Sequence, residues 1–155
     1  MGREETVGEP KKHKDLELLA PIFRYAFEAW LNEAQATIRH IEFRVNETRR
    51  YADRQAWLWR QGREAPYLDK PIVTWTKESL HQWGLAADWF FVRLNQDGVP
   101  IENAVWEADS YRWIYRTVPP GPYGLRTIEG DYCHLEYVLA KEAIARADEL
   151  GLYRA

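Results

Sequence analysis

The segment Ser79-Leu-His-Gln-Trp-Gly-Leu-Ala-Ala-Asp88 concentrates the most unusual combination of residues in this chain. A glycine and two alanines separate His81 from Asp88, and such small residues let the backbone turn and pack closely. The segment leads into residues 87–94, whose aromatic and branched side chains predict a strand that ends at the turn Asn95-Gln-Asp-Gly98. We therefore expect two side chains that can bind a metal to lie at the start of a strand.

A second cluster, Asp131-Tyr-Cys-His-Leu-Glu136, lies at the start of another predicted strand over residues 133–138. Together, His81, Asp88 and His134 offer two imidazoles and one carboxylate, a set that suits Zn²⁺ and leaves a fourth position for water. Asp131 precedes His134 by three residues, where a general base could reach that water. The two clusters thus predict an open zinc site with an adjacent base.

Other interpretations of these residues remain open from spacing alone. A histidine in a globular domain is more often a hydrogen-bonded packing residue than a ligand, and Asp131 directly after Gly130 also fits a turn residue. Alternation along the strand places Cys133 on the face opposite His134, so we do not count it as a ligand. Were Cys133 to bind, the site would be closed and structural.

The remaining segments predict an α+β domain. Phe23, Phe27 and Trp30 recur at helical spacing and indicate the buried face of a helix. Helices and strands are segregated rather than alternating regularly, which favours α+β over a doubly wound fold. We expect a flexible tail over residues 1–14 and one domain over residues 15–155. The other predicted elements are a strand at 41–45, a helix at 51–61 ended by Gly62, a short edge strand at 71–74, a helix at 109–117 with Asp109 as N-cap, and a terminal helix at 139–150 ended by Gly151.

Composition excludes several classes of function. The 155 residues carry 21 Lys and Arg against 24 Asp and Glu, and a net charge of −3 gives no sign of a nucleic-acid binder. The lone Cys133 excludes an internal disulfide and a cysteine-built zinc finger, so a metal site must use histidines and carboxylates. No stretch approaches the ~18 apolar residues of a membrane helix, and the start does not resemble a signal peptide. We expect a soluble monomer made in a cytoplasm without membrane insertion.

Eight tryptophans and nine tyrosines are many for so short a chain. Such an excess suits a groove for an extended polymer, but it suits an ordinary core equally well. Trp83 lies inside the first cluster, and Tyr132 and Tyr123 flank the second strand. We expect these three to form groove walls, and Trp89 and Phe91 to pack beneath a helix.

The two clusters together resemble the zinc peptidases of the LAS group, which comprises lysostaphin, the D-Ala-D-Ala metallopeptidases (VanY-like carboxypeptidases) and the hedgehog fold. The pattern S-x-H-x-x-G-x-A-x-D matches at Ser79, His81, Gly84, Ala86 and Asp88, and D-x-x-H-x-E matches at Asp131, His134 and Glu136. Upstream, Glu47-Thr-Arg-Arg-Tyr-Ala-Asp-Arg-Gln55 resembles a third motif of the group. The resemblance covers residues 16–138 and is strongest to the phage L-alanyl-D-glutamate endopeptidase endolysins.

The resemblance implies a hedgehog-like fold with helices packed on a small central antiparallel sheet. It implies that zinc is held by His81, Asp88 and His134 and that Asp131 is the catalytic base. By the same resemblance, Arg50 projects into the cleft as a catalytic and substrate-binding residue, and Ser79 contacts the substrate. Trp83 and Tyr132 complete the substrate-binding residues that we expect.

The implied function is zinc-dependent hydrolysis of an amide bond in the peptide stem of peptidoglycan, at the L-alanyl-D-glutamate bond. Such a phage endolysin would be made in the host cytoplasm and would act on the cell wall, in the periplasm, during lysis. Two alternatives remain: a D-alanyl-D-alanine carboxypeptidase or dipeptidase, and an inactive zinc-stabilised wall-binding or virion module. The family's Trp-Gly-Gly stretch before the final motif is missing, and Tyr51 stands where the family has serine. Both departures lie along the expected substrate groove.

Overall fold

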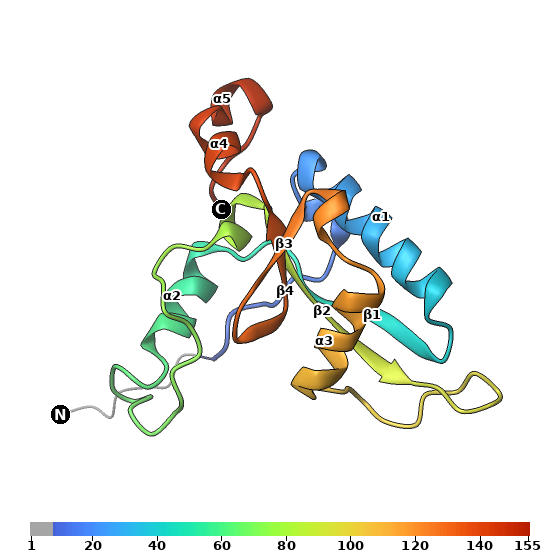
Figure 1. The fold of residues 1–155 in the computed structure, drawn as a ribbon. Helices are drawn as coiled ribbons and strands as arrows, with labels where there is room; N and C mark the ends of the chain where they lie inside the picture. The colour runs from blue at the N-terminus through green and yellow to red at the C-terminus, as the bar shows by residue number, and fades with distance from the viewer. Residues whose placement is uncertain (1–7) are drawn as a thin grey trace.

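A computed structural model describes residues 8–155 of the chain as a four-stranded antiparallel sheet with helices (Figure 1). The strand order is β1-β2-β4-β3, so the two strands with the sequence clusters, β2 and β4, are the central pair. The strands are β1 (Ile41–Glu47), β2 (Ala86–Arg93), β3 (Leu125–Ile128) and β4 (Asp131–Tyr137). The helices are α1 (Pro21–Thr37), α2 (Ala52–Arg60), α3 (Ala108–Thr117), α4 (Ala140–Ala145) and α5 (Ala147–Leu150), with 3₁₀ turns at Leu16–Leu18, Leu80–Trp83 and Gly121–Tyr123. The predicted α+β class with a small antiparallel sheet is confirmed.

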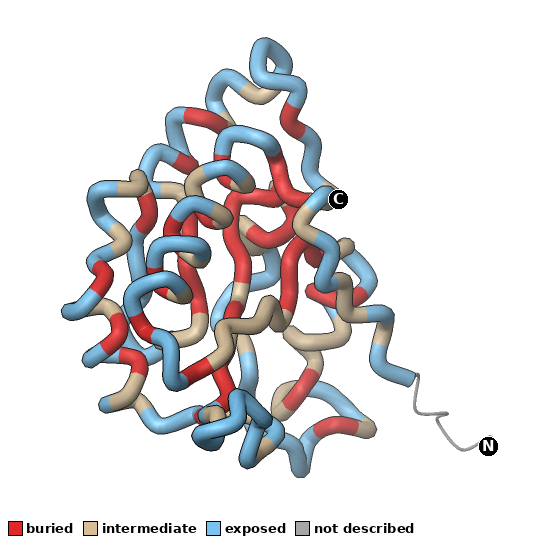
Figure 2. The backbone as a smooth tube through the Cα atoms, turned by 90° about the vertical axis from the view of Figure 1, so that its right-hand side faces the viewer, coloured by how far each residue is buried: buried red, intermediate tan, exposed pale blue. Residues whose placement is uncertain are grey.

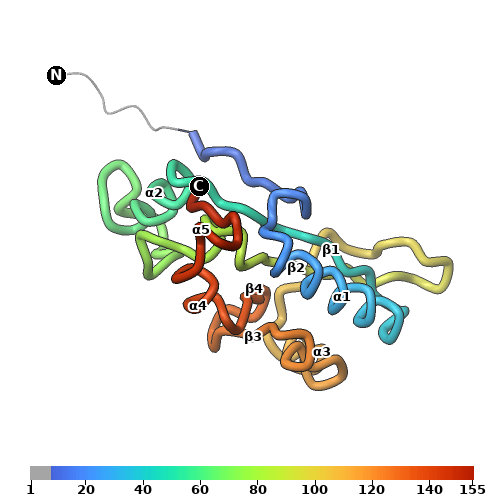
Figure 3. The backbone as a smooth tube through the Cα atoms, turned by 90° about the horizontal axis from the view of Figure 1, so that it is seen from above, coloured from blue at the N-terminus to red at the C-terminus, as the bar shows by residue number. Residues whose placement is uncertain are grey.

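The apolar core lies between the sheet and the helices α1 and α3, which run along one side of it (Figures 1 and 3). Trp89 of β2 is fully buried, with its ring centroid 5.1 Å from that of Trp30 on α1 and 4.9 Å from that of Tyr111 on α3. The buried backbone accordingly runs through the middle of the molecule (Figure 2). Because side chains alternate along a strand, Asp88 points to the other face of the sheet from Trp89. This face carries the candidate site.

The structure differs from the predicted elements in four places. Residues 71–74 form no strand, and the carbonyl of Thr74 accepts a hydrogen bond from the side chain of Arg63 instead of from a neighbouring strand. The terminal helix breaks at Arg146 into α4 and α5, and Leu152 beyond the break packs in the core. The N-cap of α3 is Glu107, whereas Asp109 lies in the first turn. Strand β3 was not predicted from the sequence.

The first part of the described chain contacts the domain. The Glu9 carboxylate pairs with Arg54 of α2 at 2.6 Å, and the backbone N–H of Thr48 donates to the carbonyl of His13 at 2.8 Å. Residues 1–7 of the predicted tail over residues 1–14 lie outside the described residues, so a flexible tail and the division at residue 14 stay predictions. No helix in the described range 8–155 has both the length and the apolar character that crossing a membrane requires.

Candidate metal centre

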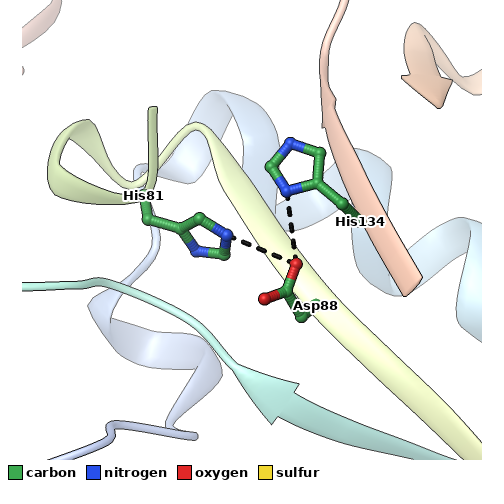
Figure 4. A group of neighbouring side chains, drawn as sticks. All are labelled: His81, Asp88 and His134. Carbon is green, nitrogen blue, oxygen red and sulfur yellow. Dashed lines mark hydrogen bonds and ion pairs between the residues drawn. The ribbon is translucent and has the colours of Figure 1, made fainter. Parts of the chain in front are cut away.

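Strand pairing brings the two sequence clusters together. Asp88 of β2 lies directly opposite His134 of β4 in the antiparallel register. His81 reaches the same place from the 3₁₀ turn before β2 (Figure 4). That turn is held by a capping box. The Ser79 side chain accepts a hydrogen bond from the backbone N–H of Gln82, and the Gln82 side chain accepts one from the backbone N–H of Ser79. The short stretch between His81 and Asp88 therefore folds both side chains toward His134.

Gly84 makes this fold possible. Its φ of +68° is a left-handed conformation that residues with a side chain rarely adopt. A Cβ atom at this position would lie 2.6 Å from Nη2 of Arg49 and 2.7 Å from the backbone nitrogen of Ala20. The glycine that the sequence pattern placed inside the first cluster is thus required by both conformation and space.

The three predicted ligands form a compact group. Oδ1 of Asp88 lies 3.3 Å from Nε2 of His81 and 3.2 Å from Nδ1 of His134. One ligand atom from each of the three residues can be chosen so that all lie within 4.8 Å of one another. Ligands at the ~2.0–2.2 Å bond lengths of tetrahedral zinc lie about 3.3 Å apart, so the two shorter separations fit such a site. The donor set of two imidazoles and one carboxylate also fits zinc.

Both imidazoles are oriented by a second oxygen on their far side. Nδ1 of His81 lies 2.8 Å from the carbonyl oxygen of Thr48, which can only accept, and Nε2 of His134 lies 2.9 Å from Oε1 of Glu136. A neutral imidazole has a single N–H, so these contacts leave Nε2 of His81 and Nδ1 of His134 as lone pairs aimed at Asp88. Lone pairs facing a carboxylate repel it, unless a cation lies between them or the rings are protonated. Carbonyl and carboxylate partners of this kind are typical of zinc-bound histidines.

The electrostatics of the group follow from this crowding. Burial alone would raise the pKa of Asp88, but the neighbouring His81 and His134 outweigh it and hold that pKa far below its usual range. Burial lowers the pKa of His134, whereas hydrogen bonds to Asp88 and Glu136 more than compensate and raise it to about 9. The group therefore attracts positive charge, as protons or as a metal ion.

Arg50 lies beside the group in a buried network. Its Nε and Nη2 donate to Oε1 of Glu47 at 3.1 and 2.6 Å, and its Nη1 donates to Oε1 of Gln55 at 2.9 Å. Nη2 also lies 3.8 Å from Oδ2 of Asp88. Among partners in the described chain, these bonds occupy three of the five N–H groups of a guanidinium, which leaves one on each of Nη1 and Nη2.

Arg49, the adjacent arginine, points elsewhere. Its guanidinium donates to the carbonyls of Leu18, Gln82 and Tyr153, at 2.7, 3.0 and 2.9 Å. These bonds hold the N-terminal and C-terminal segments to the turn that carries His81. Arg50, the arginine that the resemblance implies for the cleft, thus lies beside the group, whereas Arg49 does not.

Asp131 lies at the entrance of the site. Its Oδ2 is 3.9 Å from Nδ1 of His134, and its side chain is 54% exposed, so water and ligands can reach it. Cys133 lies 3.6 Å from Oδ1 of Asp131 through its sulfur. Burial, followed by the charges of Asp88 and Asp131, raises the pKa of this thiol, so it remains protonated and can donate to Asp131. Cys133 is not part of the three-residue group.

A cavity of about 710 Å³ opens over the group. Of the residues expected to bind substrate, Arg50 and Ser79 line it, as do Asp131 and all three predicted ligands. Trp83 and Tyr132 do not line it. Trp83 packs on the core cluster, and the ring of Tyr132 lies on the α3 side of β4, under the guanidinium of Arg112 at 4.8 Å.

Tyr123 likewise packs on the core rather than lining the cavity. The wall that the sequence did not predict is the irregular segment 72–76, which contributes every one of its residues to the cavity. Glu136, which the sequence motif contained without a role, orients His134 and pairs with Arg126 at 2.6 Å.

Comparisons with known proteins place the chain by structure rather than by sequence. No protein-family model and no curated protein sequence matches it. Its structure is similar to that of the L-Ala D-Glu endopeptidase ChiX of Serratia marcescens, with a TM-score of 0.56 and 20% identity over 90% of this chain and 95% of that one. It is also similar to the LD-carboxypeptidase LdcB, with a TM-score of 0.50 and 21% identity over 84% of this chain and 64% of that one. At these identities the likeness establishes a shared fold.

Proposed function

We propose that this protein is a zinc-dependent peptidoglycan peptidase that hydrolyses an amide bond in the wall stem peptide, the L-alanyl-D-glutamate bond. The two structural neighbours are peptidases named for bonds of this kind, and the endopeptidase matches over nearly its whole length. The sequence motifs that resemble peptidoglycan peptidases meet at the cavity of this fold.

The observation that carries the proposal is the orientation of the two imidazoles. His81 and His134 each use one nitrogen for an oxygen of the surrounding protein and turn the other toward Asp88. A zinc ion held by these three groups would satisfy every one of those atoms and would leave a position open to the cavity, as catalytic zinc sites do.

When bound, zinc supplies a coordinated water with a pKa lowered to ~7 and polarises the carbonyl to be cleaved. Asp131 then acts as general base: it takes the proton of the attacking water and returns it to the leaving amine. Arg50, with N–H groups on Nη1 and Nη2 still available, stabilises the charge that develops on the carbonyl oxygen or binds a substrate carboxylate. Glu136 and the carbonyl of Thr48 keep the imidazoles oriented throughout.

Digestion of purified peptidoglycan, followed by mass spectrometry of the muropeptides, tests this proposal. We expect products cut between L-alanine and D-glutamate, with activity lost on chelation and restored by zinc. Asp131→Asn should greatly slow the formation of the products, whereas Glu129→Gln, which removes an exposed carboxylate from the same cavity, should not. Undigested stems with zinc-loaded wild-type protein would contradict the proposal.

A second candidate is a carboxypeptidase or dipeptidase that acts on D-alanyl-D-alanine. The similarity to a carboxypeptidase favours it, and the available N–H groups of Arg50 suit a terminal carboxylate. The same mass spectra separate the two, because a carboxypeptidase shortens the stem by its terminal D-alanine and leaves L-alanyl-D-glutamate intact. A dipeptidase would instead split free D-alanyl-D-alanine that is added to the digest. An inactive wall-binding or virion module would change neither.

The biological setting, lysis of a bacterial host by a phage, is part of the proposal. Adding the protein to Gram-negative cells with a permeabilised outer membrane should lower their turbidity, and Asp131→Asn should not. If zinc-loaded wild-type protein cleaves isolated stems but leaves such cells intact, the lytic role is contradicted and the peptidase activity is not.

A further inference from the structure

One wall of the cavity consists of residues to which the proposed mechanism gives no role. The segment 72–76 lines the same cavity as the charged groups and includes the apolar residues Ile72, Val73 and Trp75. Trp75 is 83% exposed, the highest value among the large apolar residues that are exposed. Burial of an indole in an apolar contact is stabilising, so an exposed indole beside a ligand cavity indicates that a ligand covers it.

The wall is held in place by α2 and the residues after it. Nη2 of Arg63 donates to the carbonyl of Thr74 at 2.8 Å, and Nη1 donates to the carbonyl of Trp59 at 2.9 Å. The guanidinium carbon lies 3.6 Å from the centroid of the Trp59 ring and 5.5 Å from that of Trp75. Arg63 therefore fixes both the backbone before Trp75 and, by cation–π attraction, the position of its ring.

The same wall is tied to the catalytic side of the cavity. Nε2 of Gln55 donates to the carbonyl of Thr76 at 2.7 Å, while its Oε1 accepts from Nη1 of Arg50. Gly62 allows the segment to approach the end of α2, since a Cβ there would lie 2.9 Å from Cγ1 and 3.0 Å from the backbone nitrogen of Ile72. Trp75 is thus an exposed aromatic ring on an anchored support, which loses little entropy on binding.

The chemistry of the proposed substrate indicates which part of it can cover this ring. The stem peptide beside the bond to be cleaved offers a methyl group and carboxylates, and no large apolar side chain. The muramoyl sugar to which the stem is joined offers a ring whose C–H groups can stack on the negative face of an indole. The sugar is joined through a lactyl group to L-alanine, so its ring lies about two residue lengths, ~7 Å, from the L-alanyl carbonyl.

We propose that Trp75 stacks on the N-acetylmuramoyl ring and that the wall 72–76 is a saccharide subsite of the cavity. This rests on the proposed function and deepens it, because a cavity of about 710 Å³ is roughly 11 Å across and can hold both the L-alanyl-D-glutamate bond and the sugar. A D-alanyl-D-alanine bond lies three residues further along the stem, about 10 Å more, and would leave the sugar outside.

The test compares two substrates: N-acetylmuramoyl-L-Ala-D-Glu-diaminopimelate, and the same tripeptide carrying only the lactoyl group. We expect wild-type kcat/KM to favour the muramoyl substrate by about 3- to 10-fold, the range of an aromatic stacking contact. In Trp75→Ala this ratio should fall to about one, and Trp75→Phe should retain part of it. Trp113→Ala, which truncates a partly exposed tryptophan on α3, should leave the ratio at its wild-type value.

A binding measurement separates this proposal from the proposed function. In NMR spectra, the indole N–H resonance of Trp75 is identified by its absence in Trp75→Phe. Addition of N-acetylmuramoyl-L-alanine should shift this resonance until binding is saturated. Cleavage of both substrates with an unchanged ratio in Trp75→Ala would overturn the saccharide subsite and leave the peptidase intact. If neither substrate is cleaved, the proposed peptidase activity is contradicted. The saccharide subsite is then supported if N-acetylmuramoyl-L-alanine shifts the Trp75 resonance and contradicted if it does not.

Discussion

Replacing Glu136 by glutamine should weaken zinc binding without unfolding the protein. Oε1 of Glu136 lies 2.9 Å from Nε2 of His134, and the carboxylate is almost completely buried. Its charge fixes Nε2 as the protonated nitrogen, which makes Nδ1 the lone pair for the metal, and it raises the basicity of the ring. Glutamine keeps the shape of the side chain but removes the charge and can present an N–H to Nε2 in place of an oxygen.

The expected loss of affinity is about 10- to 100-fold, the usual effect of removing a second partner of a metal-bound histidine. This corresponds to about 1.4–2.7 kcal/mol in the free energy of zinc binding. The effect on folding should be smaller, because the side chain of Arg126, the other partner of Glu136, is 54% exposed and can be solvated when the carboxylate is removed.

Competition with a chromophoric zinc chelator at pH 7 measures the affinity, and thermal unfolding of the metal-free proteins measures the stability. Glu129→Gln is the matched control, because it removes an equal charge from an exposed residue of the same cavity. A zinc affinity of Glu136→Gln within about 3-fold of wild type, or an equal loss in Glu129→Gln, would refute the reasoning that orientation of His134 sets the affinity.

Three further predictions concern the other parts of the site. Asp131→Asn should keep zinc at one ion per chain by elemental analysis but lower kcat by roughly 10²–10⁴-fold, and a rate close to wild type would show that another group is the base. His81→Ala should copurify with no zinc and show no activity, and retained zinc would rule out His81 as a ligand. Glu47→Gln should lower the free energy of unfolding at pH 7 by about 3 kcal/mol in urea titrations, because it leaves two buried arginines without their carboxylate. Although burial raises the pKa of Glu47, its contacts with Arg50 and Arg54 bring it below its ordinary value of 4.5, so the wild type should lose stability as the pH falls below about 4.5, and Glu47→Gln should lose less.

Much of the fold was predictable because periodicity reports burial. Trp89 and Phe91 alternate with Asp88 along β2, and the structure buries the two aromatic rings against α1 and α3 while Asp88 faces the cavity. The helical spacing of Phe23, Phe27 and Trp30 likewise marked the buried face of α1. In each case one local pattern coincides with one face of one element, so the sequence alone is sufficient.

The wall of the cavity could not be predicted in this way. Its backbone is held by the side chains of Gln55 and Arg63, which lie 21 and 11 residues before the carbonyls that they bind, and no local pattern encodes such bonds. Pro71 and the branched residues after it therefore resembled a strand. Trp83 and Tyr132 were assigned to the groove from their nearness to the motifs, but nearness in sequence does not determine which face of an element a side chain occupies.

The register of the last two strands explains the placement of Tyr132. Thr127 pairs with Leu135, but the next residue, Ile128, pairs with Asp131, so β4 carries extra residues at this point. A regular strand would place Asp131 and His134, three residues apart, on opposite faces. The irregularity instead brings both to the cavity and turns Tyr132 toward α3, where Arg112 and Tyr115 contact it. The same local distortion therefore turns Tyr132 away from the cavity and places Asp131, the candidate base, next to His134, a candidate ligand.

The sheet also separates what stabilises the protein from what the site needs. The face toward α1 and α3 is packed with aromatic side chains, whereas the opposite face holds its geometry through charged hydrogen bonds among Glu47, Arg50 and Gln55. Substitutions that change side-chain shape on the face toward α1 and α3 should lower the unfolding temperature. They should leave zinc affinity nearly unchanged, since no candidate zinc ligand lies on that face. On the opposite face, Gln55 bonds both to Arg50 and to the wall that carries Trp75. Gln55→Ala should therefore disturb both the contact of Arg50 with the substrate and the contact of Trp75 with the sugar. A Gln55→Ala protein that loses the preference for the muramoyl substrate while keeping full activity on the lactoyl peptide would contradict that coupling.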